Sequence, residues 1–301
     1  MAPPDSPREA QLAAAIALHQ QGALDAAEAA YAALLKRQPR HFDALHLSGV
    51  IALQTGRLEA GITRIRRAIA INPRAAAAHS NLGSGLMRLQ RFADALASFD
   101  RALALDPHYA EAQNNRGYAL AKLKRFQEAV GAYDRALALR PDYAEAHSNR
   151  GHALADQQRL EEALSAHEKA LSLRPQSTEF HTSVALALGA LDRHVEALPH
   201  YDQALILKPD HAAALIGRAE ALLVLGRATE ALAMTDAVIA ANQYSVHGHM
   251  WRTRALILLG QPAAGLQAAE RARQIAPADP EVHINHGFAL VTEERRSTGI
   301  Y

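Results

Sequence analysis

The sequence predicts an all-α solenoid of antiparallel helix pairs, and three observations carry this prediction. The segment 101–112 recurs with few changes at 135–146, an offset of 34 residues. Apolar residues within one period fall into two runs with helical spacing. A fixed period of roughly 20 to 50 residues is typical of stacked repeats. Prolines follow the same period at Pro39, Pro73, Pro107, Pro141, Pro175, Pro209 and Pro277, with Gln243 in the one remaining slot.

The 34-residue period fixes the organisation of the chain. Residues 1–7 are predicted to be a disordered N-terminal tail, and residues 8–279 to be eight repeats. Residues 280–301 form a partial ninth repeat and a polar C-terminal tail, because the repeat pattern is lost after Val291. The repeats are 8–41, 42–75, 76–109, 110–143, 144–177, 178–211, 212–245 and 246–279.

The third repeat illustrates how each period forms two helices. The runs 76–89 and 92–105 both place leucine or phenylalanine three or four positions apart, which is helical spacing. The connection between the two runs is short and polar, so the helices must be antiparallel neighbours. Pro107 ends the second helix, since proline cannot continue a helix and disfavours the α conformation in the residue before it.

Two columns of small residues indicate where these helices approach each other closely. A glycine inside a helix costs about 1 kcal/mol relative to alanine, so its recurrence in one register indicates backbone contact. An aromatic column on the second helix (Tyr31, Phe99, Tyr133, Tyr201) is expected to fill the space beside it. The first-helix column holds Gly49, Gly83, Gly117, Gly151 and Gly287, and the second-helix column holds Ala27, Gly61, Ala95, Ala129, Ala163, Ala197, Ala231 and Gly265.

Composition excludes several classes of partner. The 32 basic and 31 acidic residues are interspersed and give a net charge of +1, which offers no electrostatic surface for nucleic acid or an acidic membrane. The absence of cysteine removes disulfides, thiolate metal sites and cysteine nucleophiles. Neither a signal peptide nor an apolar run long enough to span a membrane is recognised. We therefore expect a cytoplasmic protein.

No pattern in the sequence predicts catalysis or a cofactor. Phosphate-binding, dinucleotide-binding and hydrolase motifs are not found, so the chain is not expected to be an enzyme. Five of the 16 histidines share one register, which invites a metal hypothesis. Adjacent first helices should lie about 10 Å apart, too far for most pairs of rotamers to chelate one ion. We expect these histidines to pack in the structure, with no metal bound. They are His79, His147, His181, His249 and His283.

The candidate binding residues are Asn81, Asn115, Asn149 and Asn285, which share one position of the first helix. Asparagine is unfavourable inside a helix because its amide competes for backbone hydrogen bonds. Asn81 lies two residues before Gly83, roughly 200° around the helix, so it should face away from the packed partner. An amide offers a donor and an acceptor, which suits a peptide main chain. The alternative is that these amides join adjacent repeats or are simply solvated.

These features resemble the tetratricopeptide repeat family, with its 34-residue period, its small residues and its terminal proline. The resemblance implies a right-handed superhelix whose first helices line a concave groove. The family's early aromatic residue is replaced here, in most repeats by histidine. The segments 78–83, 112–117 and 146–151 further resemble repeats of protein O-GlcNAc transferase and its SPINDLY-type relatives. In that family a ladder of asparagines holds the substrate polypeptide, and a separate domain, for which this chain has no room, performs the transfer.

The sequence therefore predicts a scaffold that holds an extended protein or peptide segment in the groove, centred on Asn81, Asn115 and Asn149. The rival prediction is the substrate-recognition region of an O-GlcNAc-transferase-like glycosyltransferase whose catalytic domain is absent from this chain. Self-association through the C-terminal helix is a third possibility, because Ile284, Phe288 and Leu290 are available there.

Overall fold

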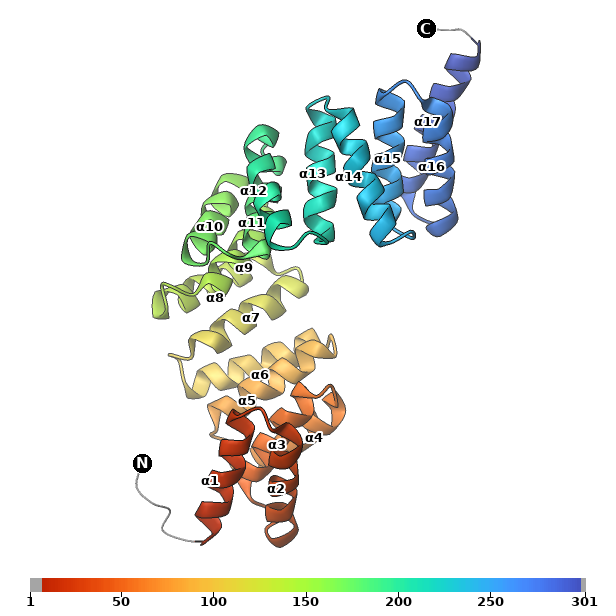
Figure 1. The fold of residues 1–301 in the computed structure, drawn as a ribbon. Helices are drawn as coiled ribbons and strands as arrows, with labels where there is room; N and C mark the ends of the chain where they lie inside the picture. Colours follow the sequence, from red (N-terminus) through yellow and green to blue (C-terminus); the bar gives the residue numbers. More distant parts are fainter. Residues whose placement is uncertain (1–6, 299–301) are drawn as a thin grey trace. The chain divides into compact units, whose positions relative to one another are not determined.

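The structure, a computed structural model, describes residues 7–298. These residues form seventeen α-helices and no strand (Figure 1). The all-α prediction is thereby confirmed. Apart from Pro7, the predicted N-terminal tail lies outside the described residues, as do residues 299–301 of the predicted C-terminal tail.

The chain divides into two compact units, residues 1–153 and 154–301, and the boundary falls within α9 (Ala144–Ala155). The N-terminal unit contains four complete helix pairs. Its first helices are α1 (Pro7–Gln20), α3 (Phe42–Gln54), α5 (Ala76–Arg88) and α7 (Ala110–Lys122). Its second helices are α2 (Leu24–Arg37), α4 (Leu58–Ile71), α6 (Phe92–Leu105) and α8 (Phe126–Leu139).

The C-terminal unit repeats the same pattern. It begins with the end of α9 and closes on the 19-residue α17. Its first helices are α11 (Thr178–Ala190), α13 (Ala212–Val224), α15 (Val246–Leu258) and α17 (Pro280–Thr298). Its second helices are α10 (Leu160–Leu173), α12 (His194–Leu207), α14 (Ala228–Ala241) and α16 (Pro262–Ile275).

Within each unit, successive hairpins stack in chain order (Figure 1). The first helices of successive repeats contact one another, as α3 contacts α5 and α13 contacts α15. Among the described residues, the second helices of successive repeats make no comparable contacts. Each unit therefore curves with its first helices on the inner side. The exposed surface of these helices is called the first-helix face below.

The glycine column packs as predicted from the sequence. A Cβ atom built on Gly83 would stand 2.6 Å from Cε1 of Phe99, and one on Gly117 would stand 2.7 Å from Cε1 of Tyr133. Both aromatic rings are fully buried. Gly287 on α17 differs, since a Cβ there would meet nothing within 4 Å. The reason is that the described residues contain no second helix after α17 that could cover it.

The proline column marks the ends of the second helices, but it is not required for them. α6 ends at Leu105, two residues before Pro107. α14 ends at the equivalent Ala241 although the next slot holds Gln243. The backbone N–H of Asn242 donates to the carbonyl of Val238 and closes this helix without proline. The local geometry of the seventh repeat is therefore retained.

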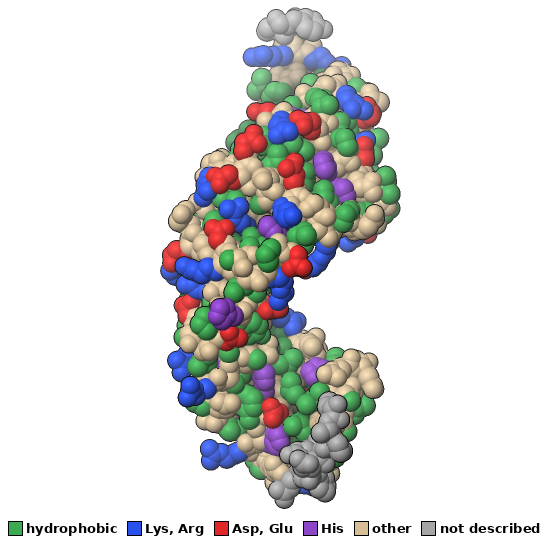
Figure 2. Space-filling view, turned by 90° about the vertical axis from the view of Figure 1, so that its left-hand side faces the viewer, with side chains coloured by type: hydrophobic (Ala, Val, Ile, Leu, Met, Phe, Trp, Pro, Cys, Tyr) green, Lys and Arg blue, Asp and Glu red, His purple; other side chains and the backbone are tan. Residues whose placement is uncertain are grey.

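Ion pairs join consecutive repeats on the surface. Arg116 pairs with Asp100 at 2.6 Å, and the same pairing recurs across 16 residues for Arg150, Arg218 and Arg252. Basic and acidic side chains alternate over the visible surface, in agreement with the balanced composition (Figure 2). Among residues 7–298, no helix is both long and apolar enough to cross a membrane.

Candidate peptide-binding sites on the first-helix face

In the N-terminal unit, the asparagine column lies between neighbouring first helices. The Nδ2 atom of Asn81 is 2.9 Å from Nε2 of His46, which lies 35 residues earlier on the preceding first helix. Burial lowers the pKa of His46, which favours the neutral ring that can accept this bond. Asn149 Nδ2 donates to Asn114 Oδ1 at 3.0 Å, again across 35 residues. These amide nitrogens therefore connect adjacent repeats, as the alternative interpretation expected.

These asparagines are nevertheless partly exposed. Asn81, Asn115 and Asn149 are half-buried, unlike the fully packed glycines two positions later. Asn115 accepts a hydrogen bond through Oδ1 from Nδ2 of Asn114 at 3.3 Å. An amide bound through one end to a neighbouring repeat still presents its other end. Their role in holding a partner chain stays a prediction.

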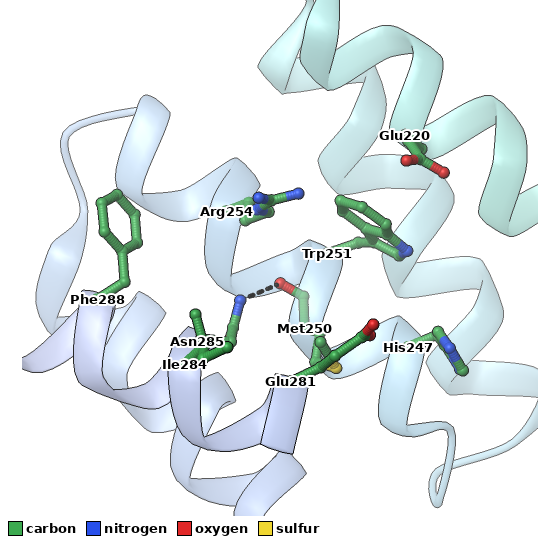
Figure 3. A pocket seen from close by; sticks show the side chains of 9 residues that line it. All are labelled: Glu220, His247, Met250, Trp251, Arg254, Glu281, Ile284, Asn285 and Phe288. Atoms are coloured by element: carbon green, nitrogen blue, oxygen red, sulfur yellow. Dashed lines mark hydrogen bonds between the residues drawn. The ribbon is translucent and has the colours of Figure 1, made fainter. Parts of the chain in front are cut away.

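Asn285, the fourth member of the column, is in the C-terminal unit and is 7% exposed. Its Nδ2 donates to the backbone carbonyl of Met250 at 3.3 Å, drawn as the dashed line in Figure 3. Its Oδ1 has no hydrogen-bond partner among the described residues. A buried acceptor without a donor costs about 1–3 kcal/mol, so this atom is prepared for an additional N–H group.

Asn285 lines a pocket of about 530 Å³ formed by three consecutive first helices, α13, α15 and α17 (Figure 3). Because α15 contacts both α13 and α17, it forms the middle of the pocket. The lining comprises Glu220 from α13, His247, Met250, Trp251 and Arg254 from α15, and Glu281, Ile284, Asn285 and Phe288 from α17.

Most of this lining is apolar and unusually exposed. Ile284 is 73% exposed and Phe288 is 54% exposed. Trp251, the single tryptophan of the chain, has a buried Nε1 that lacks an acceptor among the described residues. The guanidinium carbon of Arg254 lies 4.9 Å from the centre of the Trp251 ring, a cation–π contact that holds the indole in place.

The apolar surface continues into a second depression of about 280 Å³ that shares Trp251 and Phe288 with the pocket. Leu258 on α15 and Val224 on α13 add further exposed apolar area there. An exposed apolar surface with a polar rim is a common mark of a protein-binding site. The site can therefore accept bulky apolar side chains from a partner.

The rim of the pocket carries more negative than positive charge. Glu220 and Glu281 have no ion pair within 4.0 Å among the described residues, unlike the carboxylates of the inter-repeat pairs. Arg254 supplies the one guanidinium in the lining. The pocket therefore combines an apolar floor, two available carboxylates, and an unpaired amide oxygen beside an unpaired indole N–H.

The histidine column takes part in packing, as expected. Nε2 of His79 lies 3.0 Å from the carbonyl oxygen of Pro73, six residues earlier. His147, His181, His249 and His283 make the same contact. Each imidazole thus joins its first helix to the preceding loop in place of the family's aromatic residue. No group of three or more potential metal ligands occurs among residues 7–298.

The sequence interpretation missed Glu220, Met250 and Arg254 as site residues. Their registers carried the signal, because Met250 lies 34 residues before Ile284, and Arg254 lies 34 residues before Phe288 and 34 after Glu220. Ile284 and Phe288 had been noted only for self-association. Trp251 had been noted only as the residue that replaces asparagine in the eighth repeat. Reading the columns beside the asparagines would have grouped all of them.

Comparison with known families decides the classification. One family model, described as tetratricopeptide repeat, matches residues 12–76, 80–144 and 125–178, and a second model with the same description matches residues 188–254. The chain belongs to the tetratricopeptide repeat family. Comparison with curated proteins returns no match.

Solved structures of other tetratricopeptide repeat proteins share this fold. A chain of the APC/C hetero-tetramer Cut9–Hcn1 is similar with a TM-score of 0.67 and 15% identity, over 94% of this chain and 56% of that chain. A tetratricopeptide repeat protein from Parabacteroides merdae gives a TM-score of 0.65 and 17% identity, over 83% and 98%. YrrB, described as having an unusual peptide-binding site, gives 0.53 and 21%, over 65% and 97%. At these identities the similarity concerns the fold.

Proposed function

We propose that this tetratricopeptide repeat protein is a scaffold that binds an extended protein segment on its first-helix face. The observation that carries the proposal is the pocket in the C-terminal unit. Its floor is apolar and exposed, and Asn285 Oδ1 and Trp251 Nε1 are polar atoms without partners among the described residues. A peptide main chain supplies both the N–H and the C=O that these two atoms lack.

In the N-terminal unit, Asn81, Asn115 and Asn149 form the corresponding contacts of the proposal. Their amide nitrogens hold adjacent repeats together through His46 and Asn114, so the free edge of each amide has a fixed position. Preorganised groups bind at a lower entropic cost. Asparagines repeated along the stack match a polymer with repeating amide groups, which favours binding that is broad in sequence. The peptide-binding description of YrrB is consistent with this use of the fold.

The proposal is tested with peptides selected for binding from a library of short random sequences. Each selected peptide is titrated against the wild type and against the triple variant Asn81→Ala, Asn115→Ala, Asn149→Ala. Each hydrogen bond contributes about 0.5–1.5 kcal/mol net, so peptides that use these residues should bind roughly ten- to a thousand-fold more weakly. Circular dichroism verifies that the variant remains helical, since alanine is the better helix former.

A second pair of variants tests the pocket with a matched control. Ile284→Arg places a charge on the pocket floor, whereas Ile206→Arg makes the same change at an equally exposed position on the second helix α12 (73% and 72% exposed). We expect only Ile284→Arg to weaken binding by peptides that use the pocket. Unchanged affinity in both this variant and the asparagine variant would refute the proposal.

A second candidate function is substrate recognition for an O-GlcNAc-transferase-like glycosyltransferase. It is favoured by one observation, that Asn81, Asn115 and Asn149 occupy consecutive first helices in one register. It differs from a general scaffold in requiring a transferase to act on the bound segment. Incubating a selected peptide containing serine with a transferase catalytic domain, with and without this chain, separates the two functions. Faster glycosylation in the presence of the chain would support the second.

A further inference from the structure

We infer that the pocket of the C-terminal unit selects partner segments in which a bulky apolar side chain is flanked by lysine or arginine. This inference rests on the proposed function, because it specifies the partner of the same site. It commits to a basic, apolar linear segment as the occupant. The juxtaposition behind it is an apolar floor with carboxylates on both of its flanks.

The size and lining of the pocket call for a large apolar anchor. Trp251 and Met250 from α15 face Ile284 and Phe288 from α17 around a volume of about 530 Å³ (Figure 3). Burying apolar surface contributes about 25 cal/mol per Å², so a leucine or phenylalanine gains far more here than a small or polar residue. The neighbouring depression beside Leu258 extends this surface for a second apolar side chain.

Charge complementarity selects the residues next to the anchor. Glu220 projects from α13 and Glu281 from α17, the two helices that flank α15. Neither carboxylate has an ion pair within 4.0 Å among the described residues. With His247 neutral, the two carboxylates and Arg254 sum to −2 + 1 = −1. A basic residue on either side of the anchor gains an attraction, and an acidic residue meets repulsion.

Arg254 does not reverse this preference, because its guanidinium is engaged with the Trp251 ring. The contact also keeps the indole in one orientation, which leaves the apolar floor in place before binding. The partner main chain can then supply an N–H group to Asn285 Oδ1 and a carbonyl to Trp251 Nε1. Apolar anchoring, charge and main-chain bonding thus point to the same type of segment.

Trp251 provides a direct measurement, since the emission of the single tryptophan reports on this pocket alone. Three peptides without tryptophan are compared, each with a central leucine pair flanked by lysine, serine or glutamate. The full chain is titrated with each peptide, and the change in Trp251 emission gives the affinity. We expect the lysine peptide to bind about tenfold more tightly than the glutamate peptide, a factor equal to about 1.4 kcal/mol. The difference should shrink as salt is added.

Variants assign the preference to the two carboxylates. In the double variant Glu220→Gln, Glu281→Gln the lysine and glutamate peptides should bind within about twofold of each other, which is a loss of most of the charge term. Glu270→Gln, an exposed carboxylate on the second helix α16, is the matched control and should leave the tenfold preference intact.

The outcomes separate this inference from the proposed function. Equal binding of all three peptides, or tighter binding of the glutamate peptide, would overturn the charge preference while leaving peptide binding in place. If none of the three changes Trp251 emission while library-selected peptides bind and are released by Ile284→Arg, the basic segment is the wrong occupant. If selected peptides are also indifferent to both Ile284→Arg and the asparagine variant, the proposed function fails with it. Association of two copies of the chain through this face would appear as a concentration-dependent mass without peptide, and would also overturn the inference.

Discussion

Replacing Gly117 by leucine should destabilise the N-terminal unit, whereas the same replacement at Gly131 should stabilise it. A Cβ at position 117 would stand 2.7 Å from Cε1 and 2.9 Å from Cδ1 of the fully buried Tyr133 ring. Overpacking of this kind costs up to about 3 kcal/mol, and the helix propensity of leucine over glycine returns about 1 kcal/mol. The net expectation is a loss of about 2 kcal/mol.

Gly131 is the matched control, because it lies inside the adjacent helix α8 and a Cβ there meets nothing within 4 Å. Only the propensity effect remains, which is a gain of about 1 kcal/mol. Urea unfolding followed by circular dichroism should therefore separate the two variants by about 3 kcal/mol. Equal stability of the two would refute the assignment of the packed and open faces of these helices.

Four further predictions concern the surface, the turns and the pH dependence. Arg218→Met, which breaks the inter-repeat pair with Asp202, should change the free energy of unfolding by less than about 1 kcal/mol in urea titrations, and a larger loss would show that the pairs are structural. Gln90 adopts a φ of 58° in the turn before α6, so Gln90→Gly should raise the urea midpoint by relieving a left-handed conformation that costs roughly 1–2 kcal/mol. Burial lowers the pKa of His200, and so does the neighbouring His181. The fold thus favours neutral His200, and stability should fall as the pH drops from about 7.5 to about 5.5, through the ordinary pKa of about 6.5. His200→Phe should reduce this fall, and an unchanged pH profile would mean that other groups cause it.

The fold was largely predictable because each structural requirement repeats in the sequence. Gly83 and Phe99, or Gly117 and Tyr133, are complementary in volume, so the same pair of columns must recur wherever two helices pack in this way. The period also survives where one signal is lost, since α14 ends correctly before Gln243. Repetition allows one missing residue to be compensated by the remaining contacts of the repeat.

The candidate site was less predictable because its residues do not repeat in type. Glu220, Arg254 and Phe288 occupy one register but differ in charge and size, so no column of identical residues marks them. The bonds of the asparagine column were also hidden, because Asn81 reaches His46 and Asn149 reaches Asn114 through unlike partners. Their proximity follows from the stacking of first helices, which sequence periodicity gives only as a register.

Photo-crosslinking tests most directly whether partner segments bind on the first-helix face. A library-selected peptide carrying a benzophenone side chain is bound to the full chain, irradiated, and its attachment sites are identified by mass spectrometry. The account predicts attachment to first-helix residues, with Trp251 and Phe288 as examples on α15 and α17. Attachment concentrated on the second helices, such as α14 and α16, would contradict it.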